Sequence, residues 1–137
     1  MLDHINTLEE LEKEAIEIQG FLNIAVSDNP EEAVERGNDL AAYMSRASKM
    51  LADAKYHKDV AMKASIKSRS FGVSKTIAPS ILKQLCEADC EVENFMVNWI
   101  EKIYSGSVHQ LDWLRTVVSK AKEERRVQSG VSGNYHS

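Results

Sequence analysis

Apolar side chains recur every three or four residues along most of this 137-residue chain, and this spacing restricts the fold more than any other feature. Such steps place side chains on one face of an α-helix, because the helix has about 3.6 residues per turn. The pattern fills three segments, about residues 7–26, 30–67 and 79–126, and only two prolines interrupt the chain. We therefore predict an all-α protein.

Local signals mark where the first two helices begin. Thr7 can cap the first helix, and Glu10 three residues later completes a capping box. Asn29 suits the cap of the second helix, and Pro30 suits its first position.

Three polar stretches are predicted to lie outside regular helix. Residues 68–79 hold Gly72, several serines and a proline, which indicate a linker. Residues 105–107 (Ser-Gly-Ser) predict a kink or a break in the third helical segment. Residues 129–137 are polar and glycine-rich, and we predict a disordered tail there.

The helical segments are long for a chain of this size. At 1.5 Å per residue the second would measure roughly 55 Å, which exceeds the width of a compact domain of this length. We therefore expect a single domain, residues 1–128, built as an elongated helical hairpin or bundle of three to four helices. The apolar rows are wider than one partner helix needs, so we also expect a helical homo-oligomer.

The basic residues gather in the middle of the chain. Residues 46–83 carry nine Lys or Arg and two Asp, a net charge of +7 within a chain whose net charge is −4. This asymmetry indicates either an anionic partner or a solvated helix whose lysines pair with acidic neighbours. Charge alone leaves both interpretations open.

The basic segment has the residue types that single-stranded nucleic acid requires, which are cations for phosphates and an aromatic ring for base stacking. Lys63 and Lys67 lie one turn apart on the predicted helix. Phe71 in the linker provides an aromatic ring, and Tyr56 offers a second one. No helix-turn-helix spacing or aromatic sheet motif predicts base-specific recognition. The predicted binding residues are Lys55, Lys58, Lys63, Lys67, Arg69, Phe71 and Lys75.

Catalytic and targeting motifs are not found in the sequence. It has no phosphate-binding glycine loop and no nucleophile elbow, and its four histidines lack metal-ligand spacing. We therefore expect no enzyme activity, no cofactor and no metal. Cys86 and Cys90 are expected to be reduced packing residues. The acidic N-terminus and the lack of a long apolar run predict no membrane association and a cytoplasmic location, in the bacterial host if the chain is phage-encoded.

The run Asp59–Ala64 (DVAMKA) resembles the Val-Ala-Leu-Lys-Ala-Arg run of the UvsY-like phage recombination mediators. The layout of residues 35–122 is similar too. A second helix that grows basic precedes a Ser/Gly linker and a helical half with Ala88-Asp89 and Ser105-Gly106. The pattern also resembles short helical phage proteins without an assigned function.

The resemblance implies a non-enzymatic oligomer that binds single-stranded DNA and helps a RecA-like recombinase replace the single-strand binding protein. Lys63 matches the family's DNA-contacting lysine, whereas the family's next basic residue falls on Ser65 here. Lys67 and Arg69 can supply that charge from the next turn.

Two interpretations of other classes stay open. One is an oligomeric helical interaction protein, such as a phage adapter, a structural protein or an anti-defence protein that binds a host protein or a small anionic ligand. The other is a purely structural coiled-coil dimer.

Overall fold

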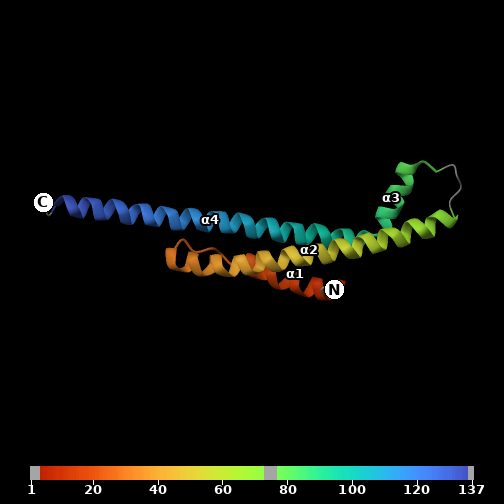
Figure 1. Cartoon of the computed structure of the whole chain (residues 1–137), viewed down its shortest axis with the longest axis horizontal. Coiled ribbons are helices and arrows are strands. Elements are labelled where there is room, and N and C mark those ends of the chain that lie inside the picture. Colours follow the sequence, from red (N-terminus) through yellow and green to blue (C-terminus); the bar gives the residue numbers. More distant parts are fainter. Residues whose placement is uncertain (1–3, 73–76, 136–137) are drawn as a thin grey trace.

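The computed structural model describes residues 4–72 and 77–135, with side chains for 4–70 and 77–130, and this part contains four helices and no strand. They are α1 (Leu8–Leu22), α2 (Pro30–Gly72), α3 (Pro79–Asp89) and α4 (Glu91–Tyr135). α2 and α4 run antiparallel along a rod, α1 packs against both, and α3 stands at one end (Figure 1). The prediction of an all-α helical bundle is confirmed.

The first two helices begin at the predicted caps. The Thr7 hydroxyl oxygen accepts a hydrogen bond from the Glu10 backbone N–H at 3.2 Å. The Asn29 side-chain oxygen accepts from the N–H groups of Glu31, at 2.9 Å, and Glu32, at 3.4 Å. These side chains satisfy N–H groups of the first turn, which have no partner within the helix.

α1 ends at Leu22, four residues before the predicted end. Carbonyl groups at this end accept hydrogen bonds from other helices. The Arg36 guanidinium donates to the carbonyls of Phe21 and Ile24, and the Gln110 amide donates to the carbonyl of Leu22 at 2.8 Å. Side chains of α2 and α4 therefore bind the free carbonyls at the end of α1, where the sequence predicted that the helix continues.

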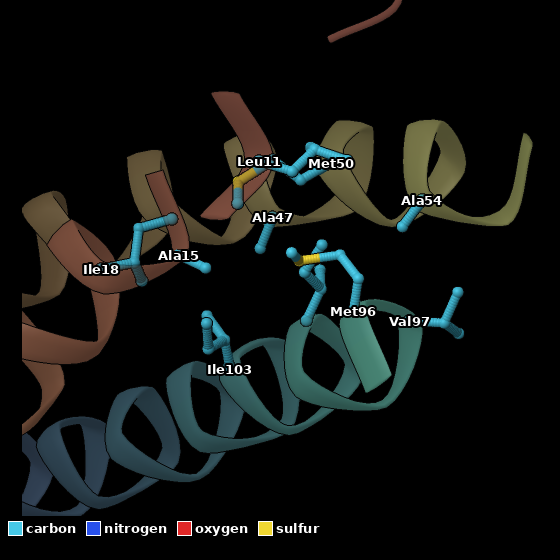
Figure 2. Packing of buried hydrophobic residues seen from close by; sticks show 10 residues of the cluster. Leu11, Ala15, Ile18, Ala47, Met50, Ala54, Met96, Val97 and Ile103 are labelled. Atoms are coloured by element: carbon cyan, nitrogen blue, oxygen red, sulfur yellow. The ribbon is translucent and has the colours of Figure 1, made fainter. Parts of the chain in front are cut away.

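The main core lies where α1, α2 and α4 meet (Figure 2). Alanines on α1 and α2 let the helix backbones approach closely, and larger side chains on all three helices fill the remaining space. Each fully buried Leu, Ile or Met contributes roughly 1.5–3 kcal/mol. The buried residues are Leu11, Ala15, Ile18, Ala47, Met50, Ala54, Met96, Val97, Ile100 and Ile103.

α2 is longer than the sequence predicted, because it continues past residue 67 to Gly72. Its 43 residues give a length of roughly 65 Å. The Ser70 hydroxyl donates to the Ile66 carbonyl at 2.6 Å, so a serine assigned to the linker bonds back onto the helix instead.

The break in the second helical half falls at Cys90, not at residues 105–107. α3 ends at Asp89, and the Cys90 N–H donates to the Glu87 carbonyl. The Asn94 side-chain amide donates to the same carbonyl at 3.2 Å. These contacts stabilise the change of direction between α3 and α4. No glycine or proline at this position marks the break in the sequence.

The predicted break at residues 105–107 is wrong because these small residues serve packing. α4 is continuous there. A methyl group at Gly106 would lie 3.6 Å from a terminal carbon of Leu22, so α1 packs directly over this turn. Ser107 is fully buried, and its hydroxyl donates to the Ile103 carbonyl of the same helix.

α4 also extends further than predicted. The structure continues it to Tyr135, whereas the sequence predicted a disordered tail over residues 129–137. This last part of α4 projects beyond the start of α2 (Figure 1). Every residue from Lys122 to Gly130 is exposed.

Candidate nucleic-acid interface

The predicted site lies on the second half of α2. The segment before α1 reaches this helix at Asp53, which accepts from the Asn6 N–H at 3.1 Å, and at His57, whose Nε2 lies 2.6 Å from the Asn6 carbonyl oxygen. After His57, α2 packs against α3 and α4 on one side. Its outer side is exposed and carries the lysines.

Four exposed residues form a line on this outer side, which we call the outer stripe: Tyr56, Val60, Lys63 and Lys67. Their steps of four, three and four place them on one helix face. Tyr56 is 49% exposed and Val60 is 48% exposed. The stripe therefore combines two ammonium groups with an accessible aromatic ring and an apolar side chain.

The lysines of the outer stripe are not neutralised by the fold. Within the described residues, neither Lys63 nor Lys67 forms an ion pair, and neither does exposed Lys55 two turns earlier. Exposed Asp59 is the acidic residue of this stretch of α2. These three ammonium groups are therefore available to an anion in solution.

Lys58 differs from the other predicted lysines because it is half-buried on the inner side of α2. It is close enough to Cys90 for its positive charge to affect the pKa of that thiol. Burial raises the pKa of Cys90, the carboxylates of Glu93 and Asp89 act in the same direction, and Lys58 lowers it. Lys58 thus faces the α3–α4 junction and lies away from the outer stripe.

Arg69 is held by an acidic residue of α3. Its Nε lies 2.7 Å from Asp89 Oδ2, and its Nη2 lies 2.8 Å from Asp89 Oδ1. The Ser65 hydroxyl donates to Asp89 Oδ2 at 2.6 Å. Hydrogen bonds from Arg69 and then Ser65 hold the pKa of Asp89 at about 2. The predicted DNA contact at Arg69 is therefore occupied by a carboxylate in this structure.

Two predicted contacts lie outside what the structure describes. Phe71 belongs to the last turn of α2, but its side chain is not among the described side chains, and Lys75 lies between the two described ranges. Of the seven predicted residues, the structure brings Lys63 and Lys67 together on one face, with Lys55 nearby.

Sequence reasoning did not single out Val60, and it offered Tyr56 only as a second ring. The signal was present as the 56-60-63-67 spacing, which is the helical spacing also used to find the core. This second row lies on the face of α2 opposite buried Ala54 and Ser65.

Comparisons with protein-family models, with curated proteins and with solved structures found no match to this chain. None of the described helices is long and apolar enough to span a bilayer. Among the described residues, no group of three or more His, Cys, Asp or Glu is placed to hold a metal ion.

Proposed function

We propose that this protein is a non-enzymatic accessory protein of DNA recombination that binds single-stranded DNA, like the UvsY-like phage mediators. The observation that carries this proposal is the outer stripe, where Lys63 and Lys67 lie on one face with exposed Tyr56 and form no ion pair within the described part of the chain. Lysines neutralise phosphates and release counterions, and an exposed ring stacks on a base of any identity.

The proposed binding has little sequence preference. Phosphate contacts fix the position of a strand but carry no sequence information, and stacking accepts every base. The two lysines of one stripe neutralise few phosphates, so one chain binds weakly by itself. A homo-oligomer adds the stripes of several chains, and linked weak sites bind far more tightly than single sites. Assembly is therefore part of the proposed function, as is delivery of the strand to a RecA-like recombinase.

One observation favours a second candidate, an oligomeric helical interaction protein that binds a host protein. Val92 and Phe95 near the start of α4 are each 63% exposed, and Phe95 lies beside Trp99 with ring centroids 5.9 Å apart. Exposed apolar side chains of this size are typical of protein–protein contacts. The same surface also suits self-assembly, so it is compatible with both candidates.

The first experiment compares two double variants in a titration with labelled oligothymidylate at several salt concentrations. Lys63→Ala with Lys67→Ala removes the cations of the outer stripe. Lys13→Ala with Lys102→Ala removes the same charge from exposed positions on α1 and α4. We expect the stripe variant to bind more weakly and to lose about 0.7 from the salt slope for each lost phosphate contact.

The control variant should keep the wild-type salt slope. Equal losses in both double variants would reject the outer stripe as the site. Wild-type protein that shows no salt-sensitive binding at low ionic strength would reject the proposed function itself.

A further inference from the structure

We propose that an acidic face of α1 in one copy of this chain docks into a groove between α2 and α4 of a second copy. The inference concerns self-association and does not depend on DNA binding. It goes beyond the proposed function because it names the two surfaces that meet. It rests on an apolar groove with a basic rim and on an acidic helix face with an apolar centre.

The groove lies where the first part of α2 passes the second half of α4 (Figure 1). All the residues that line it belong to these two helices, so α1 of the same chain does not fill it. Its volume is about 480 Å³, and an adjoining hollow of about 210 Å³ continues it toward the start of α2. Val34 in the lining is 53% exposed, so the single chain leaves apolar surface open to water. The apolar lining includes Ala33, Val34, Ala41, Leu111, Leu114 and Val118.

Basic side chains border the groove on its α4 side. Arg115 and Lys122 line the groove, and Lys122 and Arg125 line the hollow that continues it. Within the described residues, Lys122 and Arg125 form no ion pair, and Arg115 pairs with Asp112 on its own helix. Glu31 is the one acidic residue among these lining residues. The rim therefore favours an acidic partner.

The acidic face of α1 has the complementary properties. It consists of Glu9, Glu12, Ile16 and Gly20, four exposed residues whose steps of three and four place them on one side of the helix. Ile16 is 58% exposed, and Glu9 and Glu12 form no ion pair within the described part of the chain. α1 as a whole carries five glutamates and one lysine. This face therefore presents an apolar side chain beside free carboxylates.

The two surfaces match in length. On α1, Gly20 follows Glu9 by eleven residues, and on α4, Arg125 follows Leu114 by eleven residues. At 1.5 Å per residue, each stretch extends over roughly 16 Å. Nothing lies within 4 Å of a methyl group added at Gly20, so another helix can approach α1 closely at this end.

The order of charged and apolar residues fixes the direction of docking. When α1 lies antiparallel to α4 of the second copy, Glu9 faces Arg125 and Glu12 faces Lys122. The remaining part of the acidic face, with Ile16 at its centre, then lies over the apolar lining. This direction places opposite charges together and buries exposed apolar surface at the same time.

The contact joins two different surfaces, so each chain keeps one free surface of each kind after one contact forms. Repetition of such a contact gives a closed ring or a filament, whereas a two-fold dimer joins identical surfaces. Neither surface includes a residue of the outer stripe.

The test is a charge reversal followed by mixing, with sedimentation velocity of the full-length chain as the readout. Glu9→Lys with Glu12→Lys reverses the acidic face, and Lys122→Glu with Arg125→Glu reverses the rim. Each variant alone sets like charges against each other, so we expect its dissociation constant for self-association to rise more than about tenfold. An equimolar mixture should assemble again, because every face then finds a rim of opposite charge on the other variant.

The matched control is Glu87→Lys with Glu101→Lys, which makes the same change of charge at exposed positions of α3 and α4 outside both surfaces. It should assemble like the wild type. A control that dissociates as much as the face and rim variants would overturn the proposal, and so would a mixture that stays dissociated. A monomeric wild-type chain would also overturn it.

Circular dichroism checks that each variant keeps its helices. If Glu9→Lys with Glu12→Lys loses helix content, the single variants Glu12→Lys and Lys122→Glu repeat the mixing test. The experiment contains no DNA, so a failed rescue would reject this contact while leaving the outer stripe as the proposed DNA site. Absence of salt-sensitive DNA binding would instead reject the proposed function and leave the contact standing.

Discussion

At the residue scale, Arg36 and Arg69 carry the same guanidinium group in opposite settings. Arg36 lies over the Phe21 ring at 4.4 Å, and its guanidinium donates to two carbonyls at the end of α1 and to Gln110. These contacts are all made by Nη2 and fix α1 against α2 and α4, whereas Nε is buried and has no hydrogen-bond partner among the described residues. Arg69 has a single acidic partner at an exposed position, so another anion can replace that partner.

Asp89 gives a prediction for acid pH. Hydrogen bonds from Arg69 and then Ser65 lower its pKa from an ordinary value of 3.8 to about 2. Because the folded pKa lies below the unfolded one, the pair stabilises the fold above about pH 4, and this contribution is lost as the pH falls through about 2.

We expect Arg69→Gln to move the pKa of Asp89 back toward its ordinary value. NMR titration of the Asp89 carboxyl carbon measures the midpoint in both proteins. The same midpoint with and without Arg69 would contradict the pairing seen in the structure.

At the scale of the elements, helix starts could be predicted from sequence and the internal break could not. Thr7 and Asn29 cap helices through N–H groups two or three residues away, so the whole signal is local. At the end of α3, the Cys90 N–H and the Asn94 amide donate to the Glu87 carbonyl, and Arg69, twenty residues away in sequence, binds Asp89. None of these residues is a glycine or a proline, and so the position of the break was missed.

The error at Gly106 arises from a long-range contact. A glycine flanked by serines is a typical helix-breaking pattern, but here it lies against Leu22, which is more than eighty residues away in sequence. The candidate site also has a part that depends on local sequence and a part that depends on long-range contacts. The row of Lys63 and Lys67 could be predicted from helical spacing, whereas the neutralisation of Arg69 by Asp89 could be seen only in the structure.

Gly106→Ala tests the continuity of α4. A methyl group there would meet Leu22 at 3.6 Å, an ordinary van der Waals distance. Alanine is favoured over glycine inside a helix by about 0.5–1 kcal/mol, so we expect the variant to be more stable by a similar amount. Denaturant unfolding at fixed protein concentration measures the difference.

Gly20→Ala in α1 is the matched control, because nothing lies within 4 Å of the added methyl group. The free energy of unfolding of Gly20→Ala should rise only by the contribution of helix propensity. Destabilisation by Gly106→Ala, with the usual gain for Gly20→Ala, would show that α4 needs a flexible point at this position.

At the scale of the whole molecule, the chain is a rod whose surface keeps several large apolar side chains exposed, including Ile16, Val34, Phe95 and Trp113. They are distributed over α1, α2 and α4, so one neighbouring helix cannot cover them all. This distribution is the reason to expect a homo-oligomer held by the long helices.

Light scattering should report a particle several times heavier than one chain at micromolar concentration. Deleting residues 129–137 should leave the number of subunits unchanged, because we expect the long helices to hold the assembly, and Ser129 and Gly130, at the start of this segment, are exposed. A monomeric wild-type protein, or loss of assembly on this deletion, would contradict the expectation.

The most direct test of the proposed DNA face is the chemical reactivity of individual lysines. Full-length protein is acetylated briefly with and without oligothymidylate, and mass spectrometry compares each lysine in the two samples. We predict that DNA protects Lys63 and Lys67, while exposed Lys13 and Lys102 react equally in both samples. Bound DNA that leaves Lys63 and Lys67 as reactive as in the free protein would contradict this prediction.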